Sequence, residues 1–409
     1  MLIHWIWLAT RPDLSERQKL AVLDAFGDPE DIFYADKARF ANVEGMTQAD
    51  AEALLDKDLT EAQQILDDCV AKDIHICTYR DGAYPARLKN ISDPPVILYY
   101  KGNLTGLDSC PVIGVVGTRK ASAYGLTTSK KMGYQIAKCG GILVSGLAEG
   151  NDGSAMTGAL TAGGKVIGVL GCGVDVVYPA MHRSLYRDTE QNGCLISEFP
   201  PKTPPYKWNF PKRNRIISGL SNGVLVVEAP EGSGSLITAR RAADQGRDVF
   251  VVPGNIDVPT FRGSNALLRD GAIAVSSGWD VVSEYEALYP DKIHKETKES
   301  VFLSTSEKTL PKVAQKPDTP AKKPLFDRKK EKKTIDNTEK KTYSVQQDIL
   351  ASLSQEEREL LKPLEKGEAL VDDLIAASGL PAGKVLSMLT MLQIRGAVEL
   401  LPGKRIALK

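Results

Sequence analysis

Apolar residues recur along the chain with two different spacings. Between about residues 110 and 275, apolar runs of about four to six residues alternate with stretches of helical spacing. Near-continuous apolar runs are typical of strands buried on both faces, and the intervening helices supply the crossovers of a parallel sheet. The expected strands are Val112–Val116, Ile142–Ser145, Val166–Leu170, Cys194–Ser197, Val224–Glu228, Asp248–Val252 and Ala272–Val275. The pattern predicts an α/β fold with a Rossmann-like, doubly wound parallel sheet in a domain spanning residues 76–290.

Helical spacing dominates the segment before this sheet. Residues 1–75 are expected to form a small helical domain of the SAM or helix-hairpin-helix kind, with helices over residues 14–26, 32–40, 48–55 and 59–72. Gly45 is placed in a tight turn, where backbone amides could approach a phosphate. A structural role for this turn is favoured, because Asp50, Glu52 and Asp56 in the following helix would repel DNA.

The chain after the sheet divides into two parts. Residues 291–343 are rich in lysine, proline and threonine and predict a disordered linker. Residues 344–409 predict a winged-helix domain: a helix opened by a capping box at Ser354–Glu357, helices over 370–378 and 382–394, and a hairpin of 398–401 with 405–408. Its third helix offers few polar side chains to a DNA groove. Protein contact or a structural role is therefore weighed above DNA recognition, which stays open.

Composition and charge narrow the class of protein only a little. The 409 residues are 42% hydrophobic and carry equal numbers of basic and acidic side chains, so any site for a polyanion must be local. Six cysteines without a C-x-x-C pair suggest buried, reduced thiols, and four scattered histidines suggest no metal site. The apolar start is too short for a signal peptide, and no apolar run reaches the roughly 20 residues that cross a bilayer. We expect a cytoplasmic protein with no membrane contact.

The first candidate binding residues lie where the first predicted strand ends. The strand runs into Gly117, Thr118 and Arg119, and Ser122 follows shortly before a helix. Ligands of doubly wound sheets bind at the carboxyl ends of strands. A glycine lets the backbone approach a phosphate, the hydroxyls can donate, and arginine offers a two-pronged charged group. This turn predicts phosphate binding.

Other predicted strands end in similar turns at the same edge. Ser145 ends the second strand and Gly146 follows it, and Ser233, Gly234 and Ser235 precede a later helix. Free amides at helix N-termini favour an anion there. Neither a complete G-x-G-x-x-G fingerprint nor a G-x-x-x-x-G-K-[ST] loop is present, so neither a dinucleotide cofactor nor ATP is expected.

The stretch from Lys207 to Leu220 combines cations with aromatic rings. Its candidate binding residues are Lys207, Phe210, Lys212, Arg213, Asn214 and Arg215. Cations can neutralise the phosphates of a nucleic-acid strand while Trp208 and Phe210 offer faces on which bases stack. One of these two rings is expected to belong to the core instead. The stretch extends the predicted site from one phosphate to a strand of nucleic acid.

The ordered motifs resemble those of the DNA-processing protein A (DprA/Smf) family. They are DGAYPARL, GTRKASAYG, SGLAEGNDGSA, GCGVDVVYP, SEFPP, FPKRNRIISGLS, SGSLITARRA and VPGNIDVPTFRGSNALLRDGA, and together they cover the chain apart from the linker. The resemblance implies a non-catalytic, cytosolic protein that binds single-stranded DNA, protects incoming DNA in natural transformation and loads the recombinase RecA onto it. It also implies a homodimer formed through the Rossmann-like domains.

Two positions depart from the family pattern, and one alternative function remains. Thr118 replaces the usual serine, and Asn151 replaces the usual isoleucine of the second turn, whose shape is therefore open. The alternative is a nucleotide-processing enzyme resembling the phosphoribohydrolases. Their P-G-G-x-G-T-x-x-E signature is replaced here by the segment Pro253–Asp257, which lacks the second glycine, the threonine and the glutamate.

Overall fold

The computed structural model describes residues 1–295, 357, 360–394, 397–401 and 405–408. Contacts between residues divide the chain into two compact units, Met1–Lys308 and Thr309–Lys409. The predicted linker and the capping box at Ser354 fall almost wholly outside the described residues. The separation of residues 1–75 from 76–290 as domains stays a prediction.

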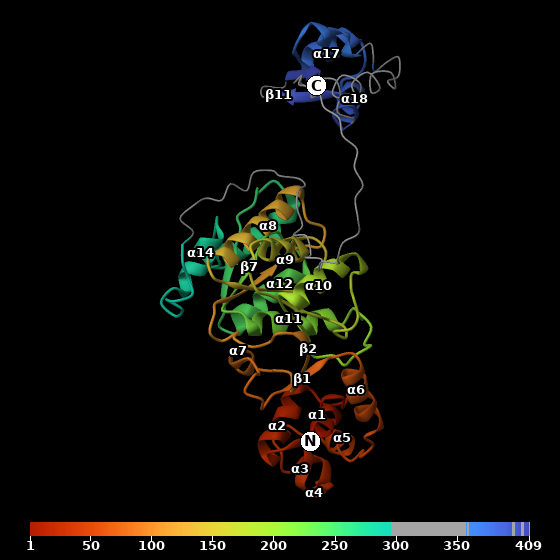
Figure 1. Ribbon diagram of the computed structural model, residues 1–409, viewed down its shortest axis with the longest axis vertical. Coiled ribbons are helices and arrows are strands. Elements are labelled where there is room, and N and C mark those ends of the chain that lie inside the picture. The colour runs from red at the N-terminus through yellow and green to blue at the C-terminus, as the bar shows by residue number, and fades with distance from the viewer. Residues whose placement is uncertain (296–356, 358–359, 395–396, 402–404, 409) are drawn as a thin grey trace, which may run out of the picture. The chain divides into compact units, whose positions relative to one another are not determined.

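Nine strands of the described chain form one mixed sheet in the first unit (Figure 1). Its order is β1-β2-β6-β5-β4-β3-β7-β8-β9, and the strands from β6 to β9 run parallel. The parallel strands are β3 (Val112–Val116), β4 (Ile142–Ser145), β5 (Val166–Val169), β6 (Gly193–Ser197), β7 (Gly223–Val226), β8 (Asp248–Val251) and β9 (Ile273–Ala274). All seven strands expected from the apolar runs are present, which confirms the predicted Rossmann-like sheet.

Alternate residues of the strands pack against helices on the two faces. On β3, Ile113 and Val115 belong to one buried cluster, whereas Val112 and Val116 belong to another. The first cluster includes residues of α8 (Ala123–Lys138), α9 (Asn151–Thr161), α10 (Arg183–Gln191) and α14 (Gly278–Val282). The second includes residues of α7 (Ala86–Lys89), α11 (Asn209–Leu220), α12 (Gly234–Asp244) and, partly buried, α13 (Arg262–Arg269). Helices therefore cover both faces, and the strand ends stay free for a site.

The antiparallel strands β1 (His75–Thr78) and β2 (Ile97–Gly102) extend the sheet beyond β6. Neither strand was predicted from the sequence. Figure 1 shows the N-terminal helices gathered beside these two strands. The helices are α1 (Leu2–Ala9), α2 (Glu16–Phe26), α3 (Pro29–Tyr34), α4 (Lys37–Phe40), α5 (Gln48–Ala53) and α6 (Thr60–Ala71).

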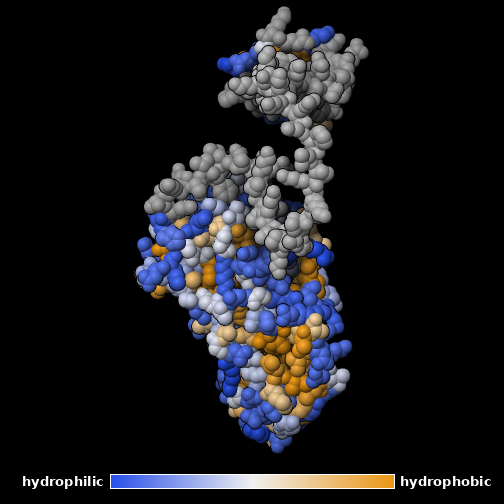
Figure 2. Space-filling view, in the orientation of Figure 1, coloured by the Kyte–Doolittle hydropathy of each residue, from blue (hydrophilic) through white to orange (hydrophobic). Residues whose placement is uncertain are grey.

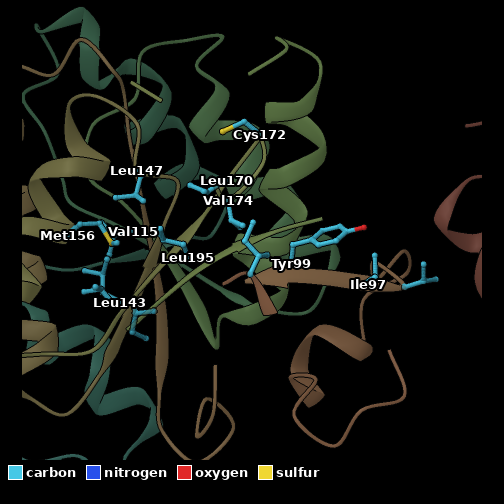
Figure 3. Packing of buried hydrophobic residues seen from close by; sticks show 14 of the residues in the cluster. Ile97, Tyr99, Val115, Leu143, Leu147, Met156, Leu170, Cys172, Val174 and Leu195 are labelled. Atoms are coloured by element: carbon cyan, nitrogen blue, oxygen red, sulfur yellow. The ribbon is translucent and has the colours of Figure 1, made fainter. Parts of the chain in front are cut away.

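The N-terminal helices share a hydrophobic core with the sheet. Trp7 of α1 belongs to the same buried cluster as Tyr99 of β2 and Leu195 of β6. Figure 3 shows Tyr99 between Leu195 and Ile97, with its hydroxyl directed toward the Ile97 side. Gly45 has a φ of 77°, as its predicted place in a tight turn requires.

The second unit has the predicted winged-helix elements. Helices α17 (Val371–Ser378) and α18 (Ala382–Ile394) precede the hairpin of β11 (Val398–Leu401) and β12 (Arg405–Leu408), and the short β10 (Ala369–Leu370) pairs with β12. Leu374, Val385 and Leu392 lie in its core.

The described surface is mixed in hydropathy, and the cysteines are as expected. On the face seen in Figure 2, hydrophobic residues gather over the N-terminal part of the chain, and most of the remaining described surface is hydrophilic. None of the described helices is long and apolar enough to span a membrane. All six cysteines are free, and five of them are buried, as predicted.

Candidate nucleic-acid interface

A pocket of ≈ 400 Å³ opens at the carboxyl ends of β3 and β7. The chain leaves β3 through α8 toward β4 on one side of the sheet, and it enters β7 from α11 on the other. Such a point of reversal is where doubly wound sheets bind ligands. The turn after β3, the segment Pro230–Ser235 that leads into α12 and the first turns of α11 supply most of the pocket lining.

The turn after β3 packs closely against Asn151 because Gly117 has no side chain. A Cβ at Gly117 would lie 2.2 Å from the amide nitrogen of Asn151. The Thr118 amide donates to the carbonyl of Glu228 at 2.7 Å, which joins this turn to the end of β7. Ser122 is the N-cap of α8 and also donates to the Glu228 carboxylate at 3.0 Å. Local capping thus fixes the turn that carries Arg119.

Arg119 is the exposed cation of the pocket. Its guanidinium carbon lies 5.0 Å from the centroid of the Phe210 ring, within the range of a cation–π contact. Within the described chain, Arg119 makes no ion pair with an acidic side chain. Phe210 itself packs against Tyr178 with ring centroids 5.6 Å apart. One wall of the pocket therefore combines a free positive charge with an aromatic ring.

Arg213 lies deeper in the pocket and is 4% exposed. It donates to the carbonyl of Gly146 at 2.9 Å and also to the carbonyl of Val169. Burial raises the pKa of the neighbouring Asp152 carboxyl, and the charge of Arg213, followed by a hydrogen bond from Ser145, acts against that rise. Arg213 thus joins the ends of β4 and β5 and places a second positive charge at the base of the pocket.

The opposite wall is the beginning of α12. Ser233 is its N-cap and accepts from the Ser235 amide, and the two hydroxyls lie 2.7 Å apart. Thr238, one turn further on, is 1% exposed and also lines the pocket. Its hydroxyl and the Nε of Arg213 are buried without a hydrogen-bond partner among the described residues. Helix amides, hydroxyls and these unused donors form a site suited to an anion.

Nine of the fifteen residues proposed from the sequence line this pocket: Gly117, Thr118, Arg119, Phe210, Arg213, Asn214, Ser233, Gly234 and Ser235. Three others lie behind it: Ser122 caps α8, Ser145 donates to the carbonyl of Val115, and Gly146 packs against Arg213. Lys207 is exposed between Tyr206 and Trp208, whose rings stack 4.7 Å apart. The remaining two, Lys212 and Arg215, lie elsewhere.

Helix α11 divides the cation-rich stretch between two faces. Phe210, Arg213, Asn214 and Ile217 line the pocket at helical spacing. Arg215 points away from it and is 5% exposed. Its guanidinium pairs with Glu198 at 2.5 Å and with Asp93 at 3.2 Å. Because its charge is committed to these carboxylates, we do not retain Arg215 as a DNA-binding residue.

Asp152 and Thr238 are among the pocket residues that were not predicted from the sequence. They lie within the motifs SGLAEGNDGSA and SGSLITARRA, but neither was proposed as a binding residue. Thr238 follows Ser235 by three residues, so a reading of helix faces could have found it. Asp152 could have been suspected because it is an acidic residue in the first turn of the helix that follows β4.

Comparison with known sequences then decides the family. Residues 75–286 match the family model described as DNA recombination-mediator protein A. Protein Smf of Synechocystis sp. is 34% identical over 352 residues, which are 84% of this chain and 82% of that protein. The chain belongs to the DprA/Smf family.

Other DprA/Smf proteins match parts of the chain. DNA processing protein DprA of Bacillus subtilis is 45% identical over 201 residues, 49% of this chain and 68% of the relative. The X-ray structure of DNA processing protein A from Streptococcus pneumoniae superimposes with a TM-score of 0.62 at 35% identity, and covers 69% of this chain and 98% of that one. Residues 346–404 match the DprA winged helix domain, which confirms the predicted domain type.

Asn151, which departs from the usual DprA/Smf pattern, is accommodated by hydrogen bonds. It is fully buried, donates to the carbonyl of Glu228 at 3.2 Å and accepts from the Ser129 hydroxyl at 2.9 Å. Both ends of the amide are therefore satisfied, and the Asn151 side chain packs against Gly117.

Proposed function

We propose that the chain is a single-stranded-DNA-binding protein whose strand passes through the pocket at the carboxyl ends of β3 and β7. The observation that carries this proposal is the wall formed by Arg119 and Phe210, where a cation without an ion-pair partner among the described residues lies against an aromatic ring. The family relationship supports DNA as the polyanion, because relatives are named as DNA processing proteins.

Each part of the pocket has a distinct task in this proposal. The beginning of α12, with Ser233 and Ser235, receives a backbone phosphate, and Arg119 neutralises it or the next one. Phe210 offers its ring to a base. A base in a duplex has both faces covered by its neighbours, so a stacking site of this kind favours a single strand.

The biological role that we propose rests on the resemblance to the DprA/Smf family. We propose that the protein acts in the cytoplasm without catalysing a reaction, protects incoming DNA during natural transformation and loads RecA onto it. We also propose a homodimer formed through the Rossmann-like domains. Sedimentation of the full chain would test the dimer, and RecA filament assembly on strands precoated by a single-strand-binding protein would test the loading.

The phosphoribohydrolase-like enzyme remains the second candidate because of one observation. A buried carboxyl with a raised pKa, Asp152, lines the same pocket, and such groups are common in active sites. Incubation with a nucleoside monophosphate tests it: release of free base that is lost in Asp152→Asn would establish the enzyme and displace our proposal.

Binding to matched single-stranded and duplex oligonucleotides tests the main proposal. We expect the full chain to bind a labelled oligothymidine at least tenfold more tightly than a duplex of equal length, measured by fluorescence anisotropy. Equal affinity for both forms would contradict the stacking role of Phe210 and would point to backbone binding alone.

A further inference from the structure

Two aromatic rings stack on each other at the surface just before α11. The centroids of the Tyr206 and Trp208 rings lie 4.7 Å apart, and the ring planes differ by only 8°. Trp208 is 63% exposed and Tyr206 is 44% exposed, although tryptophan is on average a highly buried residue. The sequence predicted that either Trp208 or Phe210 belongs to the core, and this prediction was wrong, because Phe210 is itself only half-buried. The exposed pair therefore needs a role outside the core.

The stack of Tyr206 on Trp208 leaves room for a further flat ring. Each ring has two faces, and the stack covers one face of each. Among the described residues no other ring and no cation lies over Trp208, and its high exposure places its second face at the surface. A ring that adds to the stack would bury apolar area and gain a favourable aromatic contact. A nucleobase is a ring of this kind.

The segment that carries the two rings is fixed to the wall of the pocket at the carboxyl ends of β3 and β7, the DNA pocket. The Asn209 amide donates to the carbonyl of Tyr206 at 3.0 Å, and the Asn209 side chain donates to the carbonyl of Gly171 at 3.1 Å. Gly171 also packs against the Phe210 ring. Several prolines between residues 200 and 211 restrict the backbone further. The exposed pair and the ring of the DNA pocket are therefore held by the same contacts.

Unpaired lysines flank the exposed rings. Lys207 lies between the two rings in the sequence, and Lys212 follows Trp208 by about one helical turn, on the same face of α11. Both lysines are exposed, and neither has an ion-pair partner in the part of the chain that the structure describes. Residues 199–212 include no acidic residue. Free ring faces beside free cations are the combination that binds single-stranded nucleic acid without reading its sequence.

We propose that the Tyr206–Trp208 stack is a second stacking site, which holds a base of the bound strand outside the DNA pocket. The inference rests on the function proposed for that pocket and extends the path of the strand beyond Phe210. The Cα atoms of Trp208 and Phe210 are about 5 Å apart at the start of a helix, so a strand that leaves the pocket reaches Trp208 within a few nucleotides. Lys207 and Lys212 neutralise the phosphates beside the stacked base.

Oligothymidines of graded length, from about 4 to about 16 nucleotides, test the second stacking site by fluorescence anisotropy with the full chain. We expect Trp208→Ala to weaken binding of the longest strands about fivefold to thirtyfold, the effect of one lost stacked base. Binding of the shortest strands should be unchanged, because a strand that fills only the DNA pocket does not reach Trp208. Trp208→Phe keeps a flat ring and should restore most of the affinity, whereas Trp208→Leu should not. Tyr34→Ala is the control, since Tyr34 is a 73% exposed ring on α3, outside both sites.

Tryptophan fluorescence provides an independent measurement. The chain has four tryptophans, of which Trp5 and Trp7 are buried and Trp279 is partly buried, so an external quencher reaches Trp208 most readily. We expect a long oligothymidine to protect the emission of the full chain from acrylamide, and a short one to protect it much less. The protection should be absent in Trp208→Phe. Equal quenching with and without the long strand would contradict a base on Trp208.

Arg119→Ala separates the second stacking site from the DNA pocket. This variant should weaken binding at every strand length, whereas Trp208→Ala should act only on the longer strands. Wild-type affinity of Trp208→Ala at every length would overturn the second site and leave the DNA pocket standing. An equal loss at every length would place Trp208 within the DNA pocket and would also overturn it. If only Trp208→Ala weakens binding and Arg119→Ala does not, the DNA pocket is wrong and the second site stands.

Sedimentation of the full chain distinguishes a base from a second copy of the protein as the partner of these rings. Loss of self-association in Trp208→Ala, with unchanged binding of every oligothymidine, would assign the stack to a contact between copies and overturn the proposal. Unchanged self-association together with weaker binding of the longer strands would support it.

Discussion

The guanidinium carbon of Arg119 lies 5.0 Å from the centroid of the Phe210 ring, although the two residues come from different elements. Arg119 follows β3, and Phe210 lies in the first turn of α11. The sheet brings them together because both the end of β3 and the beginning of α11 lie at its carboxyl edge. Charge and ring therefore act at one place, and their contributions to DNA binding can be separated by mutation.

Removal of the Phe210 ring should weaken DNA binding without changing its salt dependence. Phe210→Leu keeps apolar volume against Gly171 and Tyr178 but removes the stacking face. We expect a loss of about 1–3 kcal/mol in binding free energy, the usual contribution of one stacked base. Anisotropy titrations of oligothymidine at two salt concentrations measure both quantities. A changed salt slope would show that Phe210 acts through the charge of Arg119 instead.

Arg213→Ala should cost folding stability as well as DNA affinity. The substitution removes hydrogen bonds to the carbonyls of Gly146 and Val169 and leaves Asp152 buried without its cation. Breaking such a buried charged contact costs about 3–5 kcal/mol. Thermal unfolding of Arg213→Ala measures this loss of stability. Arg119→Ala is the control and should unfold like the wild type. Equal stability of the two variants would contradict the anchoring role of Arg213.

Replacement of Asn151 by the usual family residue should destabilise this protein unless Ser129 changes too. Asn151→Ile leaves the fully buried Ser129 hydroxyl without its acceptor, at a cost of about 1–3 kcal/mol. Adding Ser129→Ala removes the unpaired hydroxyl and should restore part of the stability. Denaturant unfolding of the single and double variants measures the difference. A double variant no more stable than Asn151→Ile would refute this explanation.

Thiol labelling should distinguish Cys110 from the buried cysteines. Burial raises the pKa of Cys69 and of Cys172 to about 11, and that of Cys77 to about 12. At pH 8 a thiol of pKa 11 is ionised in about one molecule in a thousand, and this fraction grows tenfold with each pH unit. We expect one fast equivalent with Ellman's reagent at pH 8, at the half-buried Cys110, and six after denaturation. Rapid native labelling of Cys172 would contradict the packing beside the pocket.

The parallel sheet could be predicted because its strands are buried on both faces and therefore read as apolar runs. Strands β1 and β2 could not be predicted, because their pairing with the rest of the sheet defines them rather than an apolar run. Ile97–Gly102, for example, mixes apolar, aromatic and charged residues and pairs antiparallel with β6. Helix α1 was not predicted either, because its apolar sequence was interpreted only as a possible signal peptide.

The pocket was predictable at its turns and less so along α11. Gly117 and Ser233 follow or precede elements whose ends must meet at one edge of the sheet. The cations of α11 could be sorted only once the start of the helix at Asn209 was known, because that start decides which side chains share a face. Arg213 and Arg215 then fall on different faces, and only Arg213 lines the DNA pocket.

The salt dependence of oligothymidine binding by Arg119→Ala tests the central claim most directly. Each phosphate contact on a single strand contributes about 0.7 to the slope of log affinity against log salt concentration. We predict that Arg119→Ala lowers the magnitude of this slope by about 0.7 and weakens binding at low salt. Arg269→Ala, at an exposed arginine outside the pocket, should change neither. An Arg119→Ala protein with the affinity and slope of the wild type would contradict a phosphate contact in this pocket.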